Sequence, residues 1–287
     1  MLTTFATVRE TLQFSAALRL SAEVPEATRL QFVEDVLELL ELDHIADNMV
    51  GDETTATNLS PGQRKRLNIG VELVANPTVL FLDEPTSGLD SRAAMSVMRA
   101  IKRVALTGRT VVATIHQPSA EIFYKFDSLL LLQKGDHTAY FGSVRNRGRD
   151  MVQYLESIPG TPKLPPRTNP ADWMLAVIGS GVALDRRVDA RVFTESWHRS
   201  GIKVKASRLI EGAGTPRPGS KPLAFKRTYE RSLCQQLPVV IKRQMQAAWR
   251  NVGLNCALWG WGRTVLGWPD NVCAWQSLGC CSCPSWD

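Results

Sequence analysis

The sequence lacks long apolar runs, and this absence limits the kinds of protein that it can encode. A membrane-spanning helix needs about 18 or more consecutive apolar residues, and none of the 287 residues belongs to such a run. The first residues, MLTTFATVRE, also lack the basic start and apolar core of a secretory signal. We therefore expect a cytosolic chain with no membrane-spanning helix of its own.

Cysteine is scarce outside the last part of the chain. Cys234 stands alone, and the other five cysteines lie at or after Cys256. A disulfide framework is not expected in a cytosolic chain. Cys280 and Cys283 have the spacing of a zinc-ligand pair, but no second pair or nearby histidine completes a site. A zinc site is therefore not predicted.

A strong charge of one sign is also missing. The net charge of +6, with 22% charged and 44% hydrophobic residues, is that of an ordinary globular protein and favours no particular partner. Arg64-Lys65-Arg66 is the one basic cluster of interest. We interpret it as a solvated helix face, and nucleic-acid binding remains the alternative.

The first part of the chain has the pattern of helices. Residues 6–42 are predicted to be helical, starting at a Thr7–Glu10 pair with capping-box spacing. A further helix is expected from Ser60 to about Ala75, where Asn76-Pro77 forms a stop signal.

The pattern then changes to that of an α/β fold. The short apolar runs TVLFL (78–82) and TVVATI (110–115) flank a helix-like segment, SRAAMSVMRAIKRVA. Continuous apolar strands separated by a helix predict a buried parallel sheet covered by helices. SLLLLQKG and TAYFG predict a hairpin at the edge of that sheet.

Two carboxylates end the first apolar strand. Asp83 and Glu84 follow VLFL and precede PTSGLD, so they lie at the carboxyl edge of the sheet, where ligands bind in open α/β folds. The first carboxylate suits Mg²⁺, and the second can polarise an attacking water as a general base. A buried strand followed by an acidic turn is the non-functional alternative.

Two further features point to phosphate chemistry. The helix start Ser60-Pro61-Gly62-Gln63 has short side chains, so an anion can approach its backbone N–H groups. His116 ends the second strand beside the expected position of Glu84, where it can hydrogen-bond a phosphate or the attacking water.

In this order, LSPGQ, LFLDEP, SGLD and TIHQPS resemble the nucleotide-binding domain of an ATP-binding cassette (ABC) transporter. ELVANP and NPADWML are similar to the G subfamily, and to the second domain of pleiotropic drug resistance transporters. The resemblance implies a partial ABC ATPase fold, in which a parallel RecA-like sheet adjoins a helical subdomain.

The resemblance also implies roles for single residues in binding ATP and Mg²⁺. Ser60, Gly62 and Gln63 match the signature loop, which contacts the γ-phosphate of ATP held by an opposing domain. Asp83 matches the Walker B aspartate, which serves Mg²⁺. Glu84 matches the catalytic glutamate, Asp90 matches the D-loop and His116 matches the switch histidine.

The sequence departs from the family in three places. No P-loop, G-x-x-x-x-G-K-[ST], is present, and the near match GTPRPGSK (214–221) is interpreted as linker. Pro61 replaces the usual signature glycine, a change we expect to weaken the contact without abolishing it. The Trp- and Cys-rich end resembles a mis-spliced or frame-shifted reading. We therefore expect a chain truncated at both ends.

The predicted organisation follows from these matches. Residues 1–76 form a helical subdomain, 77–158 a RecA-like core, 159–225 a linker region, 226–255 a connecting helix and 256–287 an aberrant or disordered tail. The apolar stripe of the connecting helix, from Leu233 to Trp249, is expected to be a packing face.

The predicted function is that of an ATPase domain that drives export of drugs or lipophilic compounds. Its expected partners are a second nucleotide-binding domain, arranged head to tail, and a transmembrane domain at the cytoplasmic face of a membrane. Two alternatives remain: a non-catalytic fragment that only pairs with another domain, and an ABC ATPase that acts on nucleic acid.

Overall fold

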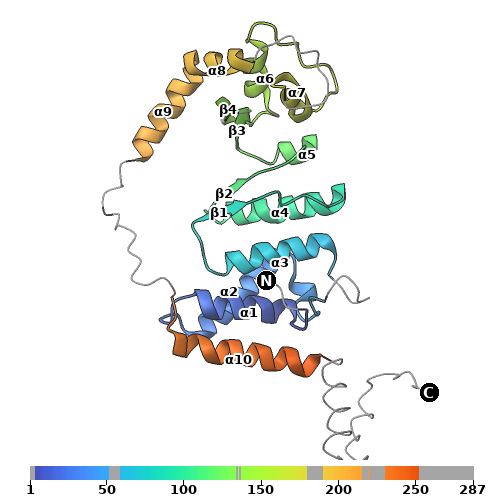
Figure 1. Cartoon of the computed structure of the whole chain (residues 1–287), viewed down its shortest axis with the longest axis vertical. Helices are drawn as coiled ribbons and strands as arrows, with labels where there is room; N and C mark the ends of the chain where they lie inside the picture. Colours follow the sequence, from blue (N-terminus) through green and yellow to red (C-terminus); the bar gives the residue numbers. More distant parts are fainter. Residues whose placement is uncertain are drawn as a thin grey trace, which may run out of the picture.

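The computed structural model describes residues 4–51, 59–133, 135, 137–179, 190–214, 219 and 230–251 (Figure 1). The elements follow one another in space in roughly the order of the chain, from the first helices to the hairpin predicted after residue 127 (Figure 1). The first group is helical: α1 (Val8–Arg19), α2 (Glu26–Leu39), η1 (Asp43–Ile45) and α3 (Pro61–Leu73). The predicted helices over residues 6–42 and from Ser60 are thus confirmed.

Helix α1 begins at the predicted capping box. The Thr7 hydroxyl accepts a hydrogen bond from the backbone N–H of Glu10, and the Glu10 carboxylate accepts one from the backbone N–H of Thr7, at 3.1 and 3.0 Å. Two N–H groups that lack partners inside the helix are satisfied in this way.

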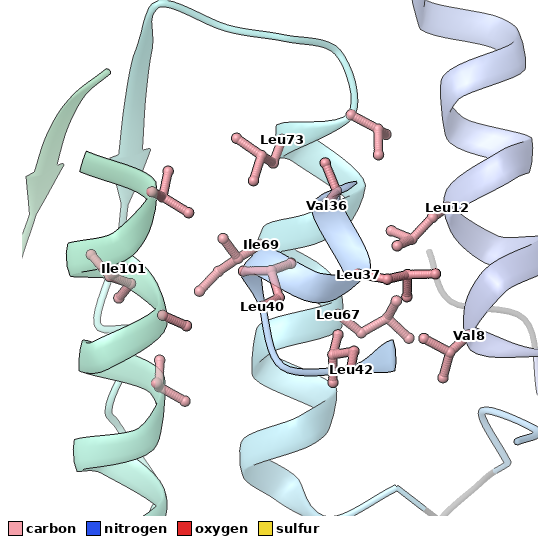
Figure 2. Close-up of a cluster of buried hydrophobic side chains, with 14 of the residues drawn as sticks. Val8, Leu12, Val36, Leu37, Leu40, Leu42, Leu67, Ile69, Leu73 and Ile101 are labelled. Carbon is pink, nitrogen blue, oxygen red and sulfur yellow. The ribbon is translucent and has the colours of Figure 1, made fainter. Parts of the chain in front are cut away.

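The helices share one hydrophobic core, shown in Figure 2. Leu12 of α1, Leu37 of α2 and Leu67 of α3 are fully buried in it. Helix α4 (Ser91–Leu106) adds Ile101, and strand β1 (Val79–Leu82) adds Leu80. One core therefore crosses the predicted boundary between the helical subdomain and the RecA-like part.

Strands β1 and β2 (Thr110–Ala113) pair in parallel, as predicted, with Leu82 opposite Ala113. The α/β class is therefore confirmed. The expectation of a buried sheet covered by helices holds for only one face of β1 in the described residues. Side chains alternate along a strand: Leu80 packs into the core, whereas Phe81 on the other face is 76% exposed.

The predicted hairpin is present, but the prediction that it lies at the edge of the β1–β2 sheet is wrong for the described residues, where it forms a separate sheet. Strands β3 (Ser128–Gln133) and β4 (His137–Ser143) are antiparallel. Their second core, which includes Tyr140, Leu155 and Phe193, is separate from the first. The helices around it are α5 (Ala120–Phe123), α6 (Arg149–Glu156), α7 (Pro170–Val177), α8 (Ala190–Arg199) and α9 (Gly201–Ala213).

The basic triplet is not a solvated face, which corrects the interpretation of the sequence. Arg66 is buried, and its Nη1 donates to the carbonyl oxygen of Leu40 at 2.8 Å. Burial lowers the pKa of the Arg66 guanidinium. Arg64 donates to carbonyl oxygens of the chain before α3, and Lys65 to that of Glu84. These side chains fasten α3 to its neighbours.

The last described helix, α10 (Leu233–Arg250), returns to the start of the chain and lies against α1 (Figure 1). It packs through its basic face. Arg250 pairs with Glu10 at 2.6 and 2.8 Å, and the Arg243 guanidinium lies 4.0 Å from the centre of the Phe14 ring. The Arg250 guanidinium holds the pKa of the Glu10 carboxyl below its usual value.

The apolar stripe of α10 is therefore not a packing face in this structure, contrary to the prediction. Its large side chains are exposed, Leu233 by 80% and Trp249 by 75%. The reason is that the ion pair with Glu10 and the stacking on Phe14 turn the opposite face of the helix toward α1. Pro238 lies inside α10, which continues through it.

Several predicted features lie outside the described residues, namely the tail from 256 to 287 with Cys280 and Cys283, and most of GTPRPGSK. Within the described ranges, no helix combines the length and the apolar character that a bilayer crossing requires.

The contact between α1, α2 and α3 depends on a glycine, which yields a stability prediction. A Cβ at Gly70 would lie 2.9 Å from Leu40 Cδ1 and 3.1 Å from Leu12 Cδ2. Both leucines are fully buried, so overpacking should exceed the gain in helix propensity. We expect Gly70→Ala to lower the free energy of unfolding by about 1 kcal/mol, measured by urea denaturation.

Gly201→Ala at the start of α9 is the matched control, because no heavy atom of the described residues lies within 4 Å of a Cβ built there. It should leave stability unchanged or raise it by a few tenths of a kcal/mol. Equal effects of the two substitutions would show that the helices do not meet as closely as described.

Candidate functional site

The candidate site begins where β1 and β2 end. The parallel register that places Leu82 opposite Ala113 brings the following residues, Asp83 and Thr114, side by side. The Thr114 hydroxyl donates to Asp83 Oδ1 at 2.6 Å and accepts from the Glu84 backbone N–H at 3.0 Å. One side chain directly after β2 thus positions both predicted carboxylate residues.

Glu84 opens a tight turn. Its φ of 43° lies in the left-handed region, which a non-glycine residue adopts at an energetic cost. Its carbonyl oxygen accepts from the Ser87 N–H at 3.1 Å, and Gly88 follows with a φ of 74°. Asp83 and Glu84 both remain exposed, so their carboxylates are accessible to water, a cation or a phosphate ligand.

The start of α3 is a second preorganised part of the site. The Ser60 hydroxyl accepts from the Gln63 N–H at 3.3 Å, and the Gln63 Oε1 accepts from the Ser60 N–H at 2.8 Å. Pro61 occupies the first helical turn, where its missing N–H costs little. Ser60 is exposed, so this helix start is accessible to an anion from outside.

Two contacts join the start of α3 to residues that follow β1, one in α4 and one in the turn at Glu84. A Cβ at Gly62 would lie 3.2 Å from that of Ala93 in α4, so the absence of a side chain lets the two helix starts approach closely. Lys65 Nζ donates to the Glu84 carbonyl oxygen at 3.4 Å. The structure therefore brings the predicted signature residues and the predicted carboxylates into one region.

Asp90 lies in the same region and is the N-cap residue of α4. Its carboxylate caps α4 by accepting from the Ala93 N–H at 2.6 Å. This bond fixes the position of the aspartate at the start of α4, next to Gly62.

His116 is exposed and lies two residues beyond Thr114. In the described part of the chain, no hydrogen bond links it to Glu84, so their cooperation stays a prediction. In the loop that follows His116, Gln117 has a φ of 44°. A hydrogen bond connects this loop to the residue before α7: the Pro118 carbonyl oxygen accepts from Asn169 Nδ2 at 2.9 Å.

Three positioning residues were missed at the level of sequence: Thr114, Lys65 and Asn169. Thr114 could have been found by setting TVLFL and TVVATI in parallel register, which places its hydroxyl next to Asp83. No comparable signal exists for Lys65 or Asn169, since each bonds a backbone carbonyl far away in the sequence.

The side chains fit a weakly held Mg²⁺ better than a metal cage. Among the described residues, no group of three or more His, Cys, Asp or Glu side chains could hold a metal. Mg²⁺ often needs only one or two protein oxygens, because waters and substrate phosphates complete its shell. Asp83 offers one exposed carboxylate, and the Thr114 hydroxyl bonds only one of its oxygens.

Thr114→Val tests this arrangement. It removes the acceptor of the Glu84 N–H and the donor to Asp83 while keeping the side-chain shape, so we expect the Glu84 amide to exchange its hydrogen several-fold faster. The measurement is amide exchange by NMR on protein labelled with ¹⁵N-glutamate.

Thr110→Val, at the other end of β2, is the control, because the described structure shows no hydrogen bond of its side chain. It should leave the Glu84 exchange rate unchanged. An unchanged rate in Thr114→Val as well would mean that this threonine does not position the turn.

Comparison with known families shows which proteins this chain is similar to. The ABC transporter family model matches residues 2–87, and the ABC-2 type transporter model matches residues 116–197. In solved structures, an ATP-binding cassette of an ABC transporter, MJ1267, is similar at 22% identity and a TM-score of 0.41, covering 53% of this chain and 60% of that one.

Curated relatives match at higher identity. ABC transporter G family member 37 of Arabidopsis thaliana is 45% identical over 249 residues, and member 49 of Oryza sativa subsp. japonica is 45% identical over 250. Pleiotropic drug resistance protein 1 of Nicotiana tabacum is 44% identical over 247 residues.

These alignments cover 86–87% of this chain but only 17% of each relative. The chain thus spans about a sixth of the length of the curated relatives it matches. The family resemblance predicted from LSPGQ, LFLDEP, TIHQPS and NPADWML is confirmed: the chain is a homologue of the G-family ABC transporters, among them pleiotropic drug resistance proteins.

Proposed function

We propose that this chain supplies nucleotide-contacting elements to an ATP-driven transporter that exports drugs or lipophilic compounds, at the cytoplasmic face of a membrane. The observation that carries the proposal is the arrangement around Thr114. The Thr114 hydroxyl bonds both Asp83 Oδ1 and the Glu84 backbone N–H, and Lys65 bonds the Glu84 carbonyl oxygen, so both carboxylate residues are held near the start of α3. Homology to G-family transporters supplies the transport context.

Each residue of the site has a chemical role in this proposal. Asp83 holds Mg²⁺, which when bound neutralises phosphate charge. Glu84 accepts a proton from the attacking water, and its exposure leaves room for that water. His116 donates a hydrogen bond to the phosphate or orients the water.

The start of α3 acts on a different nucleotide. Ser60, Gly62 and Gln63 contact the γ-phosphate of ATP that a second nucleotide-binding domain holds, and Asp90 lies at the same interface. The exposed Ser60 cap and the first-turn N–H groups of α3 suit an anion that arrives from outside the chain. A transmembrane domain is the other expected partner.

A non-catalytic role is the second candidate, and one observation favours it. Residues 1–287 contain no G-x-x-x-x-G-K-[ST] segment, so these residues by themselves supply no P-loop for the phosphates of ATP near Asp83 and Glu84. In that case the chain contributes through the start of α3 alone. The nucleic-acid alternative loses its main support, because Arg66 is buried and Arg64 and Lys65 bond backbone carbonyls.

The missing P-loop predicts that the purified chain has no ATPase activity of its own. Phosphate release by residues 1–287 with ATP and Mg²⁺ should equal that of Glu84→Gln, because the general base has no correctly held substrate. Turnover that disappears in Glu84→Gln would contradict this prediction and would favour an active ATPase.

The shared-site proposal predicts ATP-dependent pairing. Mixed with a nucleotide-binding domain that carries a P-loop, the chain should associate in the presence of ATP, as measured by analytical ultracentrifugation. Ser60→Ala removes a hydrogen bond to a charged phosphate, worth about 1.5–3 kcal/mol, so the association should weaken tenfold or more.

Ser200→Ala is the matched control for the lost helix cap. The Ser200 hydroxyl caps α9 by accepting from the Lys203 N–H at 3.1 Å, and its loss should destabilise that helix by about 1 kcal/mol. Association should not change in this variant. Pairing that needs no ATP, or that is equally weak in both variants, would argue against a shared nucleotide.

A further inference from the structure

A cationic cavity lies between α1, α2 and α10, away from the strand ends that carry Asp83 and Glu84. Its volume is about 590 Å³. Figure 1 shows α10 lying along the first two helices, which form the opposite wall of the cavity. Apolar walls are provided by Phe14, Leu30, Val33, Val71 and Val239.

Charges of opposite sign are unequally distributed in this cavity. Two of its arginines have carboxylate partners: Arg250 pairs with Glu10 at 2.6 Å, and Arg19 with Glu72 at 2.7 Å. Four further cations line the walls, and in the described residues no ion pair joins any of them to a carboxylate. These are Arg29, Arg231, Lys242 and Arg243. Glu26 is the one remaining carboxylate in the lining.

The unpaired arginines also carry donors without acceptors. Nε and Nη2 of Arg231 and Nε of Arg243 are shielded from solvent, and no hydrogen-bond partner for them exists among the described residues. Buried N–H donors normally have partners, so three such donors in one cavity require an explanation. An acceptor brought by a ligand satisfies them.

The Arg243 guanidinium is positioned by an aromatic ring. The Arg243 guanidinium stacks at 4.0 Å from the centre of the Phe14 ring. Arg231 lies where burial, and then the charge of Arg29, lower its pKa. Arg231 and Arg29 thus line the same partly desolvated cavity and repel each other, an arrangement that a multiply charged anion relieves.

The number and kind of donors define the class of ligand. A carboxylate presents two oxygens and one charge, whereas a phosphate group presents three or four acceptor oxygens and up to two charges. Guanidinium groups match phosphate through paired N–H donors. We infer that the cavity between α1, α2 and α10 binds a phosphate group, held by Arg231 and Arg243 with Arg29 and Lys242 adding charge.

The phosphate can belong to a small soluble molecule or to a lipid headgroup, and the test separates the two. Pyrophosphate is titrated into the full chain by calorimetry. In parallel, the chain is sedimented with vesicles of phosphatidylcholine that contain phosphatidic acid, and with vesicles of phosphatidylcholine alone. Arg231→Gln and Arg29→Gln are compared with Arg145→Gln, a change of equal charge at a side chain that is 75% exposed on the distant loop after β4.

Binding of pyrophosphate that falls at least tenfold in Arg231→Gln and Arg29→Gln, but not in Arg145→Gln, supports a site for soluble phosphates. The same pattern seen only with phosphatidic acid vesicles supports a lipid headgroup. Because the Arg29 side chain makes no hydrogen bond or ion pair within the described residues, its variant remains informative even if Arg231→Gln unfolds. Binding of neither probe, or equal loss in all three variants, overturns the inference.

Discussion

The parallel pairing of β1 with β2 is the constraint on which the rest of the site depends. It sets Leu82 opposite Ala113, so the next residues along each strand meet and the Thr114 hydroxyl bonds both Asp83 and the Glu84 backbone. The pair of strands is fixed in turn by Leu80, which packs into the core shared by α1 to α4. A shift of the register by one residue would move Leu80 to the exposed face and separate Thr114 from the carboxylates.

The same core also holds the start of α3 near the strand ends. Gly62 meets Ala93 at the start of α4, and the buried Arg66 ties α3 to the end of α2. Helix α3 thus has two tasks: its apolar side completes the core, while its exposed first turn presents Ser60 to whatever lies outside. In the shared site that we propose, this division would let a helix anchored within one chain contact a ligand that another chain holds.

Much of this arrangement could be predicted from the sequence, because the signals are local. The Thr7–Glu10 cap, the helix start at Ser60 and the two apolar strands each follow from a few neighbouring residues. The orientation of α10 could not, since helical periodicity shows which residues share a face but not which face meets a neighbour. That choice depends on Arg250 and Glu10, which are 240 residues apart. The exposed Phe81 face and the bonds of Lys65 were missed for the same reason.

The central claim is that Ser60 serves a nucleotide held by another domain, while Thr114 sets the carboxylates of this chain. The most direct measurement is a structure of the full chain bound to a P-loop-bearing nucleotide-binding domain with ATP and Mg²⁺. The γ-phosphate held by the partner's P-loop should lie within hydrogen-bond distance of the Ser60 hydroxyl, with Thr114 still bonded to Asp83. ATP bound only at a distance from α3, or a complex that meets through a different face, would contradict the claim.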